Sequence, residues 1–363
     1  MNIGDIVSGR YEIVDRIGQG GMQEVFKATD RVVGRQVAVK TPLVGQTHRR
    51  FKQSAILAAK VNNHGMAKTL DYFYEDERPF LVEEFVEGET LDKAIINFAG
   101  YIDPPLAAIL FGKLAKGIGA SHHAGVVHRD LKPSNVMVTG GFSLDAVKIT
   151  DFGIATLAKE IVDQEFEENA DITKSTSGTV KGAIPFMAPE MLFRKKGQSI
   201  DSPADIWSLG CMMFYACTGQ HPFGVGMDAV LAIGTGERKP WPHFMTSNAQ
   251  FQPVGEALQS LIEWCLDPDP LVRPTADDIS QELSKLCVFS SPRFGGNIHR
   301  QHPQFSGVFF IGNDSGGETM LHRDSVFGPN RPAVDKRVVF ASFPGRPQAR
   351  AFPILVQRAD QNI

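Results

Sequence analysis

The chain has 363 residues, of which 42% are hydrophobic, so it can bury a sizeable core as one large domain or two ordinary ones. Its 37 basic and 41 acidic side chains give a formal net charge of −4. This balance provides no global field for nucleic acid or an anionic membrane, and we expect neither as a partner. The absence of a leader pattern and of any long apolar run predicts a cytoplasmic protein without a membrane segment.

The four cysteines are far apart and lack the close spacing of metal-binding or redox pairs. They lie in stretches that we interpret as helical, which favours buried, reduced thiols over disulfides or a metal site. These residues are Cys211, Cys217, Cys265 and Cys287.

The first hundred residues indicate a small antiparallel sheet with one helix. Short β-branched runs separated by turn residues predict strands at 11–17, 25–28, 36–41 and 80–85. Between the third and fourth runs, Phe51, Ala55, Ala58 and Ala59 have the spacing of a helix over about 47–61.

From Pro104 onward longer helical stretches predominate, at 104–124, 203–217, 255–266 and 275–287. The junction near Glu87 and Gly88 separates the two regions, and a cleft between unlike lobes is a common place for a ligand. We therefore divide the chain into 11–87, 88–288 and an extension over 289–363.

The extension is rich in Gly and Pro. Three apolar runs in it, 307–311, 337–343 and 351–357, are long enough to pair as strands. Two roles are open for this extension. It could dock on the helical lobe and gate substrate access, or it could be a disordered linker to another partner.

A glycine-rich segment between the first two strands resembles a phosphate-binding hairpin. Glycines let a backbone approach phosphate oxygens closely, although an ordinary turn has the same composition. Its residues are Ile17, Gly18, Gln19, Gly20, Gly21 and, on the next strand, Val25. Fifteen residues after Val25, an apolar strand ends in Lys40, whose ammonium group could reach the α- and β-phosphates of a nucleotide.

The most specific segment runs from His128 to Asn135 and is followed by Asp151-Phe152-Gly153. Phosphoryl transfer needs a carboxylate that orients the hydroxyl, a cation near the migrating phosphate and oxygen ligands for a metal ion. Asp130 supplies the first and Lys132 the second. Asn135 and Asp151 supply the third.

These motifs resemble those of the Hanks-type Ser/Thr protein kinases, particularly the bacterial members. The resemblance is collinear over roughly 280 residues and includes the later landmarks Ala188-Pro189-Glu190, Asp205-Ile206-Trp207 and Leu271-Val272-Arg273-Pro274. It implies an α+β fold with two lobes: a small antiparallel sheet with one C helix, then a larger and mainly helical lobe. By the same resemblance, Glu190 and Arg273 form a buried ion pair and Asp205 braces the catalytic loop.

The resemblance also implies ATP and Mg²⁺ as cofactors, with Mn²⁺ as an alternative metal, and Ser or Thr hydroxyls of proteins as acceptors. Val25, Ala38 and Met137 would enclose the adenine, and the backbone from Glu84 to Val86 would hydrogen-bond it. The oligomeric state is not indicated.

Arg129 resembles the arginine of kinases that are controlled by phosphorylation of the activation segment, here 151–190. A phosphate on that segment could pair with Arg129 and order it. The segment offers Thr173, Ser175, Thr176, Ser177 and Thr179. The alternative is a polar loop that is never modified.

Four positions depart from the family pattern. Gln23 stands at the third glycine position of the loop, where change is tolerated. Ser54 stands where the C helix normally carries the glutamate that pairs with the strand lysine, and Glu83 occupies the usually apolar gatekeeper position. Because a buried carboxylate needs a partner, we hypothesise that Glu83 holds Lys40, with a solvent-facing Glu83 as the alternative. Ala183 replaces a threonine whose hydroxyl bonds the catalytic residues, which predicts a slower enzyme.

An active Ser/Thr kinase is the leading interpretation because Lys40, Asp130, Lys132, Asn135 and Asp151 are all present. A nucleotide-binding pseudokinase or signalling scaffold is the alternative that Ser54 and Ala183 leave open. A third interpretation is a kinase-fold enzyme that acts on small-molecule hydroxyls, against which the intact activation segment argues.

Overall fold

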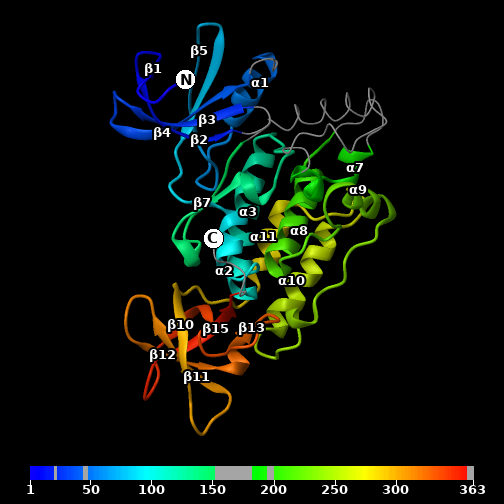
Figure 1. The fold of residues 1–363 in the computed structure, drawn as a ribbon. Helices are drawn as coiled ribbons and strands as arrows, with labels where there is room; N and C mark the ends of the chain where they lie inside the picture. The colour runs from blue at the N-terminus through cyan, green and yellow to red at the C-terminus, as the bar shows by residue number, and fades with distance from the viewer. Residues whose placement is uncertain (20–22, 44–47, 152–181, 194–199, 358–363) are drawn as a thin grey trace.

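A computed structural model describes residues 1–19, 23–43, 48–151, 182–193 and 200–357. Figure 1 shows three parts arranged in a column: a strand-rich N-lobe at one end, a helical C-lobe in the middle and a C-terminal group of strands at the other end. The first two parts form the bilobal α+β arrangement that the sequence predicts.

The N-lobe is built on an antiparallel sheet in the order β1-β2-β3-β4-β6-β5. Aromatic and β-branched residues on one face, among them Tyr11, Phe26 and Val39, pack into a common core. The strands are β1 (Ile6–Val7), β2 (Tyr11–Gln19), β3 (Gln23–Asp30), β4 (Arg35–Pro42), β5 (Thr69–Glu75) and β6 (Arg78–Glu84).

The single N-lobe helix, α1 (His48–Ala58), begins one residue after and ends three residues before the predicted helix. Its apolar residues Phe51 and Ala55 pack on Leu81 of β6, as expected from their spacing of four. The helix thus lies against the strand that leads to the junction between the lobes.

The core of the C-lobe includes many residues of two buried helices, α3 and α8. Asp103 caps α3 by accepting a hydrogen bond from the Leu106 amide at 3.1 Å, and Pro104 starts the helix. The helices are α2 (Leu91–Phe98), α3 (Pro104–His123), α7 (Pro189–Leu192), α8 (Pro203–Thr218), α9 (Gly226–Thr235), α10 (Gln252–Cys265) and α11 (Ala276–Ser284). Four 3₁₀ turns accompany them within the described residues: η1 (Pro133–Asn135), η2 (Gly141–Ser143), η3 (Ile184–Phe186) and η4 (His243–Met245).

The chain passes between the lobes at Gly88, where the backbone has φ 148°. A Cβ atom at this position would lie 2.1 Å from the Val138 carbonyl oxygen, so only glycine fits. Immediately beyond it, a small sheet of β7 (Glu89–Thr90), β8 (Val136–Val138) and β9 (Val147–Ile149) carries the segments that contain the predicted catalytic residues.

The C-terminal strands form a small barrel, which we call the C-terminal barrel, over residues 293–356. Four antiparallel pairings give the order β12-β11-β10-β14-β15, and a parallel contact between Met320 and Arg350 joins β12 to β15. Its elements are β10 (Arg293–Gln301), β11 (Val308–Asn313), β12 (Glu318–His322), η5 (Arg323–Ser325), β13 (Val326–Phe327), β14 (Arg337–Phe343) and β15 (Arg350–Val356). The three predicted apolar runs correspond to β11, β14 and β15.

The C-terminal barrel is docked on the C-lobe. Phe327, Val339 and Leu355 belong to the same buried cluster as the helices of the C-lobe. At this interface Arg293 forms an ion pair with Asp103 at 2.8 Å, and the two side chains are 2% and 1% exposed. The extension is therefore a folded part that packs on the helical lobe, at the end of the molecule away from the N-lobe (Figure 1).

The cysteine prediction is correct at three of four positions. Cys211, Cys217 and Cys265 are buried free thiols, and burial raises the pKa of Cys265 to about 12. The prediction is wrong for Cys287, which is exposed because it follows the end of α11 rather than lying in it. Within the described ranges, no helix combines the length and hydrophobicity that a bilayer crossing requires.

Candidate active site

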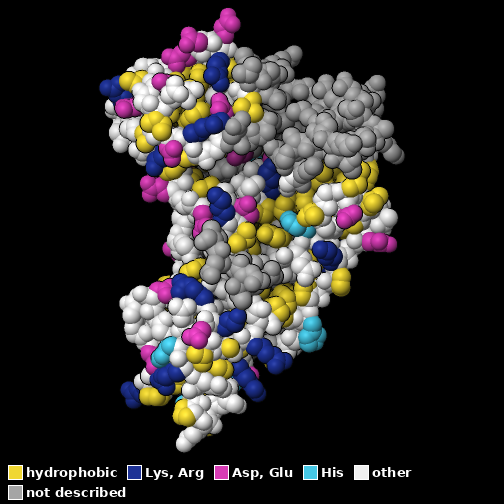
Figure 2. All heavy atoms as spheres, viewed as in Figure 1, with side chains coloured by type: hydrophobic (Ala, Val, Ile, Leu, Met, Phe, Trp, Pro, Cys, Tyr) yellow, Lys and Arg dark blue, Asp and Glu magenta, His cyan; other side chains and the backbone are white. Residues whose placement is uncertain are grey.

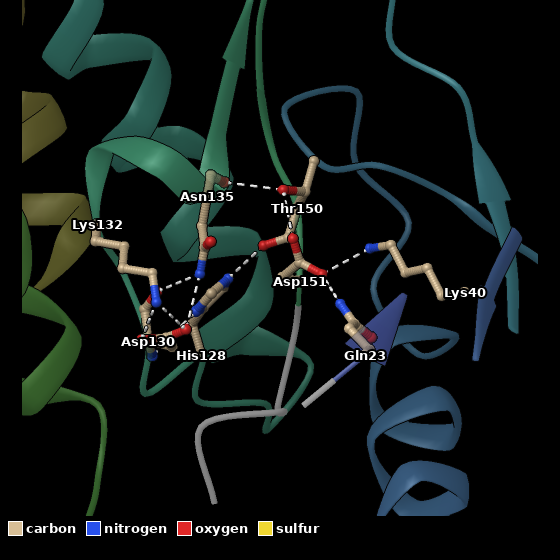
Figure 3. A network of polar contacts seen from close by, with 8 residues as sticks. All are labelled: Gln23, Lys40, His128, Asp130, Lys132, Asn135, Thr150 and Asp151. Carbon is tan, nitrogen blue, oxygen red and sulfur yellow. Dashed lines mark hydrogen bonds and ion pairs between the residues drawn. The ribbon is translucent and has the colours of Figure 1, made fainter. Parts of the chain in front are cut away.

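Three predicted residues of the catalytic loop lie within hydrogen-bond distance of one another (Figure 3). Lys132 Nζ donates to both carboxylate oxygens of Asp130, at 3.0 and 2.8 Å. Asn135 Nδ2 donates to Asp130 Oδ2 at 2.9 Å and to the Asp130 carbonyl at 2.8 Å. The short turn η1 brings Asn135 back over the loop, so a cation and an amide fix the orientation of this carboxylate.

Asp205 of α8 braces the catalytic loop, as the sequence predicts. Its carboxylate accepts hydrogen bonds from the backbone amides of His128 and Arg129, both at 2.7 Å, and its side chain is fully buried. Arg129 has φ 64°, a conformation that a non-glycine residue adopts only when its surroundings impose it. The predicted buried ion pair between Glu190 and Arg273 is also confirmed, because Arg273 donates two hydrogen bonds to the Glu190 carboxylate, at 2.7 and 3.0 Å.

Asp151 follows β9 and has φ 62°. Its Oδ1 accepts hydrogen bonds from Lys40 Nζ at 2.8 Å and from Gln23 Nε2 at 2.7 Å (Figure 3). Burial alone would raise the pKa of Asp151, but the Lys40 ammonium and hydrogen bonds from Gln23 and Thr150 lower it to about 2. The carboxylate is therefore ionised throughout the physiological range.

Lys40 also lies against Glu83, with Nζ 2.5 Å from Oε2. Ala38 of β4 pairs directly with Glu83 of β6, so Lys40 two residues along is its diagonal neighbour on the same face of the sheet. The two side chains are 4% and 5% exposed. Burial would lower the pKa of Lys40, yet the carboxylates of Asp151 and Glu83 raise it above its ordinary value, and Lys40 is protonated.

Glu83 has a raised pKa because burial disfavours its charge, an effect that Lys40 offsets only in part. The sequence of α1, from His48 to Ala58, contains no acidic residue that could pair with Lys40. The side chain of Ser54 lies outside the described residues. Lys40 is thus held by one carboxylate from its own sheet and one from the segment after β9.

Gln23 is the residue of this site whose role sequence reasoning missed. Its replacement of a glycine was interpreted as a change of small consequence, whereas its amide reaches Asp151 from the start of β3. The side-chain oxygen Oε1 is buried and accepts no hydrogen bond from the part of the chain that the structure describes. The signal in the sequence is that a long amide stands where the pattern has no side chain.

The predicted adenine-contacting residues Val25, Ala38 and Met137 come from β3, β4 and β8. Ala38 is buried, and the other two are half-buried. At the predicted hinge, the Glu84 side chain pairs with Lys148 at 2.7 Å. Of the other predicted nucleotide-binding residues, the structure describes Ile17, Gly18 and Val86. Gly20, Gly21 and the side chain of Gln19 are outside the described residues.

The five hydroxyl residues named in the activation segment, at 173, 175, 176, 177 and 179, also lie outside the described residues. Arg129 donates from Nη2 to the Ile200 carbonyl at 3.0 Å, on the segment that follows. Ala183, which replaces the threonine of the family pattern, is buried and 4% exposed.

Asn135 and Asp151 form a donor set that fits a small divalent cation. With Nδ2 of Asn135 turned to Asp130, its Oδ1 is available as a ligand beside the ionised carboxylate of Asp151. Mg²⁺ typically takes one or two protein carboxylates together with phosphate oxygens and water. Within the described ranges no group of three or more His, Cys, Asp or Glu residues could hold a metal ion.

Comparison with known proteins places this geometry in a family. The protein kinase domain matches residues 11–283. A probable serine/threonine-protein kinase of Clostridium perfringens is 33% identical over 312 residues, covering 84% of this chain and 42% of that protein. Serine/threonine-protein kinase PrkC of Bacillus subtilis is 28% identical, with coverages of 78% and 41%.

Serine/threonine-protein kinase pkn2 of Myxococcus xanthus is 28% identical over 346 residues, covering 90% of this chain and 40% of that protein. The chain therefore spans less than half the length of these relatives. The family match covers well over half of the chain, in the same order as the fold and the site described above. The chain belongs to the protein kinase domain family.

Proposed function

We propose that this chain is a protein-serine/threonine kinase that transfers the γ-phosphate of ATP to Ser and Thr hydroxyls of proteins. The observation that carries the proposal is the cluster of Asp130, Lys132 and Asn135, connected by hydrogen bonds of 3.0 Å or less. The names of the relatives support the same chemistry and the same class of acceptor.

In this mechanism Asp130 accepts a hydrogen bond from the acceptor hydroxyl and takes its proton as the oxygen attacks phosphorus. Lys132, two residues away, supplies positive charge to the migrating phosphoryl group. The ion pair between Lys132 and Asp130 keeps both groups in place before substrate binds, so little reorganisation is needed during transfer.

Asn135 and Asp151 are the residues that would hold the metal ion. Bound Mg²⁺, or Mn²⁺, which also takes oxygen ligands, would neutralise phosphate charge as it develops. The low pKa of Asp151 keeps its carboxylate available without a competing proton. Lys40 lies beside it and would contact the α- and β-phosphates, with Glu83 fixing its direction.

We also propose that the enzyme phosphorylates its own activation segment and that Arg129 pairs with the resulting phosphate. Supporting this, Arg129 donates to the carbonyl of Ile200, which follows the activation segment, and its buried Nε has no hydrogen-bond partner among the described residues. Peptide mapping after incubation with ATP should find phosphate within 173–179. Active enzyme with an unmodified 173–179 peptide would refute this part.

Transfer of labelled γ-phosphate to the chain itself and to a generic protein substrate tests the main proposal. Asp130→Asn should abolish transfer while Mg-ATP still raises the thermal unfolding temperature. Asp76→Asn, the same change in the exposed β5–β6 turn, is the control and should be fully active. Stabilisation by Mg-ATP without transfer in the unmodified chain would identify a nucleotide-binding pseudokinase instead.

A further inference from the structure

The C-terminal barrel carries a local excess of positive charge. Residues 293–356 contain eight Lys and Arg against four Asp and Glu, whereas the whole chain contains 37 basic and 41 acidic residues. The barrel therefore has a net positive formal charge, although the chain as a whole has a small net negative one. Figure 2 shows Lys and Arg side chains spread over the visible face of the barrel, interspersed with hydrophobic ones.

Strand register defines a row of side chains on the outside of the barrel. Phe310 of β11 pairs with Arg300 of β10 and with Met320 of β12, and Met320 pairs with Arg350 of β15. Directly paired residues point to the same face of a sheet, and the neighbours of Phe310 at 309 and 311 belong to the barrel core. Arg300, Phe310, Met320 and Arg350 therefore lie on the face opposite the barrel core, and we call them the outer row. Phe310 itself is only 7% exposed, and the Arg300 guanidinium lies over its ring.

Planar groups are stacked at one end of the outer row. The Arg300 guanidinium lies 3.5 Å from the centre of the Phe310 ring, and two hydrogen bonds to Glu318 hold it flat. The ring of His302 lies 6.2 Å from that of Phe310 and 4.8 Å from that of Phe305. Phe305 is 60% exposed. This end presents an exposed cationic plane next to an exposed aromatic ring.

Three further arginines, at 323, 346 and 350, lie in the same part of the barrel, and Arg323 is 3.7 Å from the Asp324 carboxylate. The backbone amide of Arg323 donates a hydrogen bond to the Gly307 carbonyl at 2.8 Å. Gly307 lies in the β10–β11 loop, which also carries Phe305. Arg346 in the β14–β15 loop and Arg350 are exposed, and neither has an ion-pair partner in the described part of the chain. Exposed positive charge therefore lies at Arg350, within the outer row, and at Arg346, four residues before it.

We propose that the outer row and the β10–β11 loop bind single-stranded nucleic acid, with bases stacked on Phe305, His302 and the Arg300 plane and phosphates on Arg323, Arg346 and Arg350. Unpaired bases expose the faces that stack on aromatic rings and guanidinium groups, whereas a duplex hides them. An acidic peptide would match the charge but leave the rings unused. A neutral sugar would use the rings but leave the charge unmatched.

The position of this surface agrees with the proposal. The barrel docks on the C-lobe through Phe327 of β13, Val339 of β14 and Leu355 of β15. On the outer row, Arg300 and Arg350 are exposed and Met320 is half-buried. In five-stranded barrels of the OB type, the second and third strands and adjoining loops are the usual place for oligonucleotides, although fold alone does not establish function. Because the N-lobe lies at the opposite end of the molecule (Figure 1), a bound strand would tether the kinase without obstructing the candidate active site.

Fluorescence anisotropy of the full chain with labelled single strands of about 12 nucleotides, DNA and RNA, tests this proposal. Single strands should bind more tightly than the matching duplex. Phe305→Leu, which removes the ring but not the hydrophobicity, should weaken binding roughly 5- to 100-fold, and Phe305→Tyr should keep it. Arg350→Glu should weaken binding. It should also make the slope of log binding constant against log salt concentration less steep by about 0.7, the value for one lost phosphate contact. Arg31→Glu makes the same charge change on the exposed N-lobe surface and should bind as the unmodified chain does.

Thermal unfolding of each variant excludes loss of binding through misfolding, and Asp130→Asn should bind the strand normally because the two sites are independent. The proposal is overturned if duplex binds as tightly as single strands, or if Arg31→Glu and Arg350→Glu lose affinity equally. It is also overturned if Phe305→Leu binds unchanged, since the surface would then be a non-specific anion patch. None of these outcomes depends on whether the chain transfers phosphate.

Discussion

Lys40 and Glu83 form a buried ion pair within one sheet, with 2.5 Å between Nζ and Oε2. In other protein kinases the partner of this lysine comes from the C helix, and movement of that helix controls activity. Here both partners are on neighbouring strands, β4 and β6, whose register is fixed by backbone hydrogen bonds. Alignment of Lys40 is therefore independent of where α1 lies.

Replacing Glu83 should impair ATP use. Glu83→Gln keeps the shape but removes the charge that holds Lys40, leaving only Asp151 as its anionic partner. We expect kcat/KM for ATP to fall roughly tenfold or more, equivalent to about 1.4 kcal/mol or more. Steady-state phosphate transfer at varied ATP measures it, with Glu12→Gln on exposed β2 as the control.

Introducing the missing helix carboxylate is the complementary experiment. If Glu83 has taken over its role, Ser54→Glu in the otherwise unmodified chain should not raise kcat/KM. An increase there, together with full activity of Glu83→Gln, would show that the gatekeeper carboxylate does not align Lys40.

The Asp151 carboxylate should make stability acid-sensitive. Its pKa is lowered from 3.8 to about 2 on folding, so its stabilising contribution is present above pH 4 and is lost as the pH falls toward 2. The full contribution is about 2 kcal/mol, of which about 1 kcal/mol is lost by pH 3. Urea unfolding gives the free energy of unfolding of the unmodified chain and of Asp151→Asn at each pH. The difference between the two free energies should narrow by about 1 kcal/mol between pH 6 and pH 3. An unchanged difference would contradict the shift.

Restoring the hydroxyl at position 183 should accelerate the enzyme. By the family resemblance, the hydroxyl of Ala183→Thr would bond the catalytic residues, which is worth up to about 1.5–3 kcal/mol at a charged site. We expect kcat to rise several-fold or more. Ala183→Val has nearly the same volume but no hydroxyl, and equal rates for the two variants would rule out the hydrogen bond as the cause.

Breaking the ion pair between Arg293 and Asp103 should destabilise the kinase. Arg293→Met leaves the Asp103 carboxyl group 1% exposed without its cationic partner, and breaking a buried pair in this way typically costs about 3–5 kcal/mol. The double variant Arg293→Met with Asp103→Asn should recover much of this, because asparagine also caps α3. Urea unfolding of the three variants measures it. A loss below about 0.5 kcal/mol in Arg293→Met would show that the barrel contributes little at this point.

Sequence reasoning is strongest where function depends on residues close together in the chain. The spacing of Asp130, Lys132 and Asn135 is set by one short loop, and the structure keeps the three in contact. Helix α3 is predicted to within one residue because Asp103, Pro104 and the apolar pattern all mark it. Cys287 was misplaced because helix ends are weakly marked when no glycine or proline follows at once.

Contacts between distant residues needed the fold. Gln23 and Asp151 are 128 positions apart, and nothing near either residue indicates the other. The barrel is similar: three apolar runs are visible in the sequence, but β10 and β12 are too polar to predict, since one of their faces is exposed to solvent.

The sequence by itself determined the family, the order of the lobes and the identity of the phosphate-handling residues, because these reside in short ordered motifs. It also raised the pairing of Lys40 with Glu83 as a hypothesis, from the lack of a helix carboxylate. Only the tertiary structure decided the distance between them and the position of the barrel on the C-lobe. Both depend on strand register and on the packing of segments far apart in the chain, which local residue patterns do not encode.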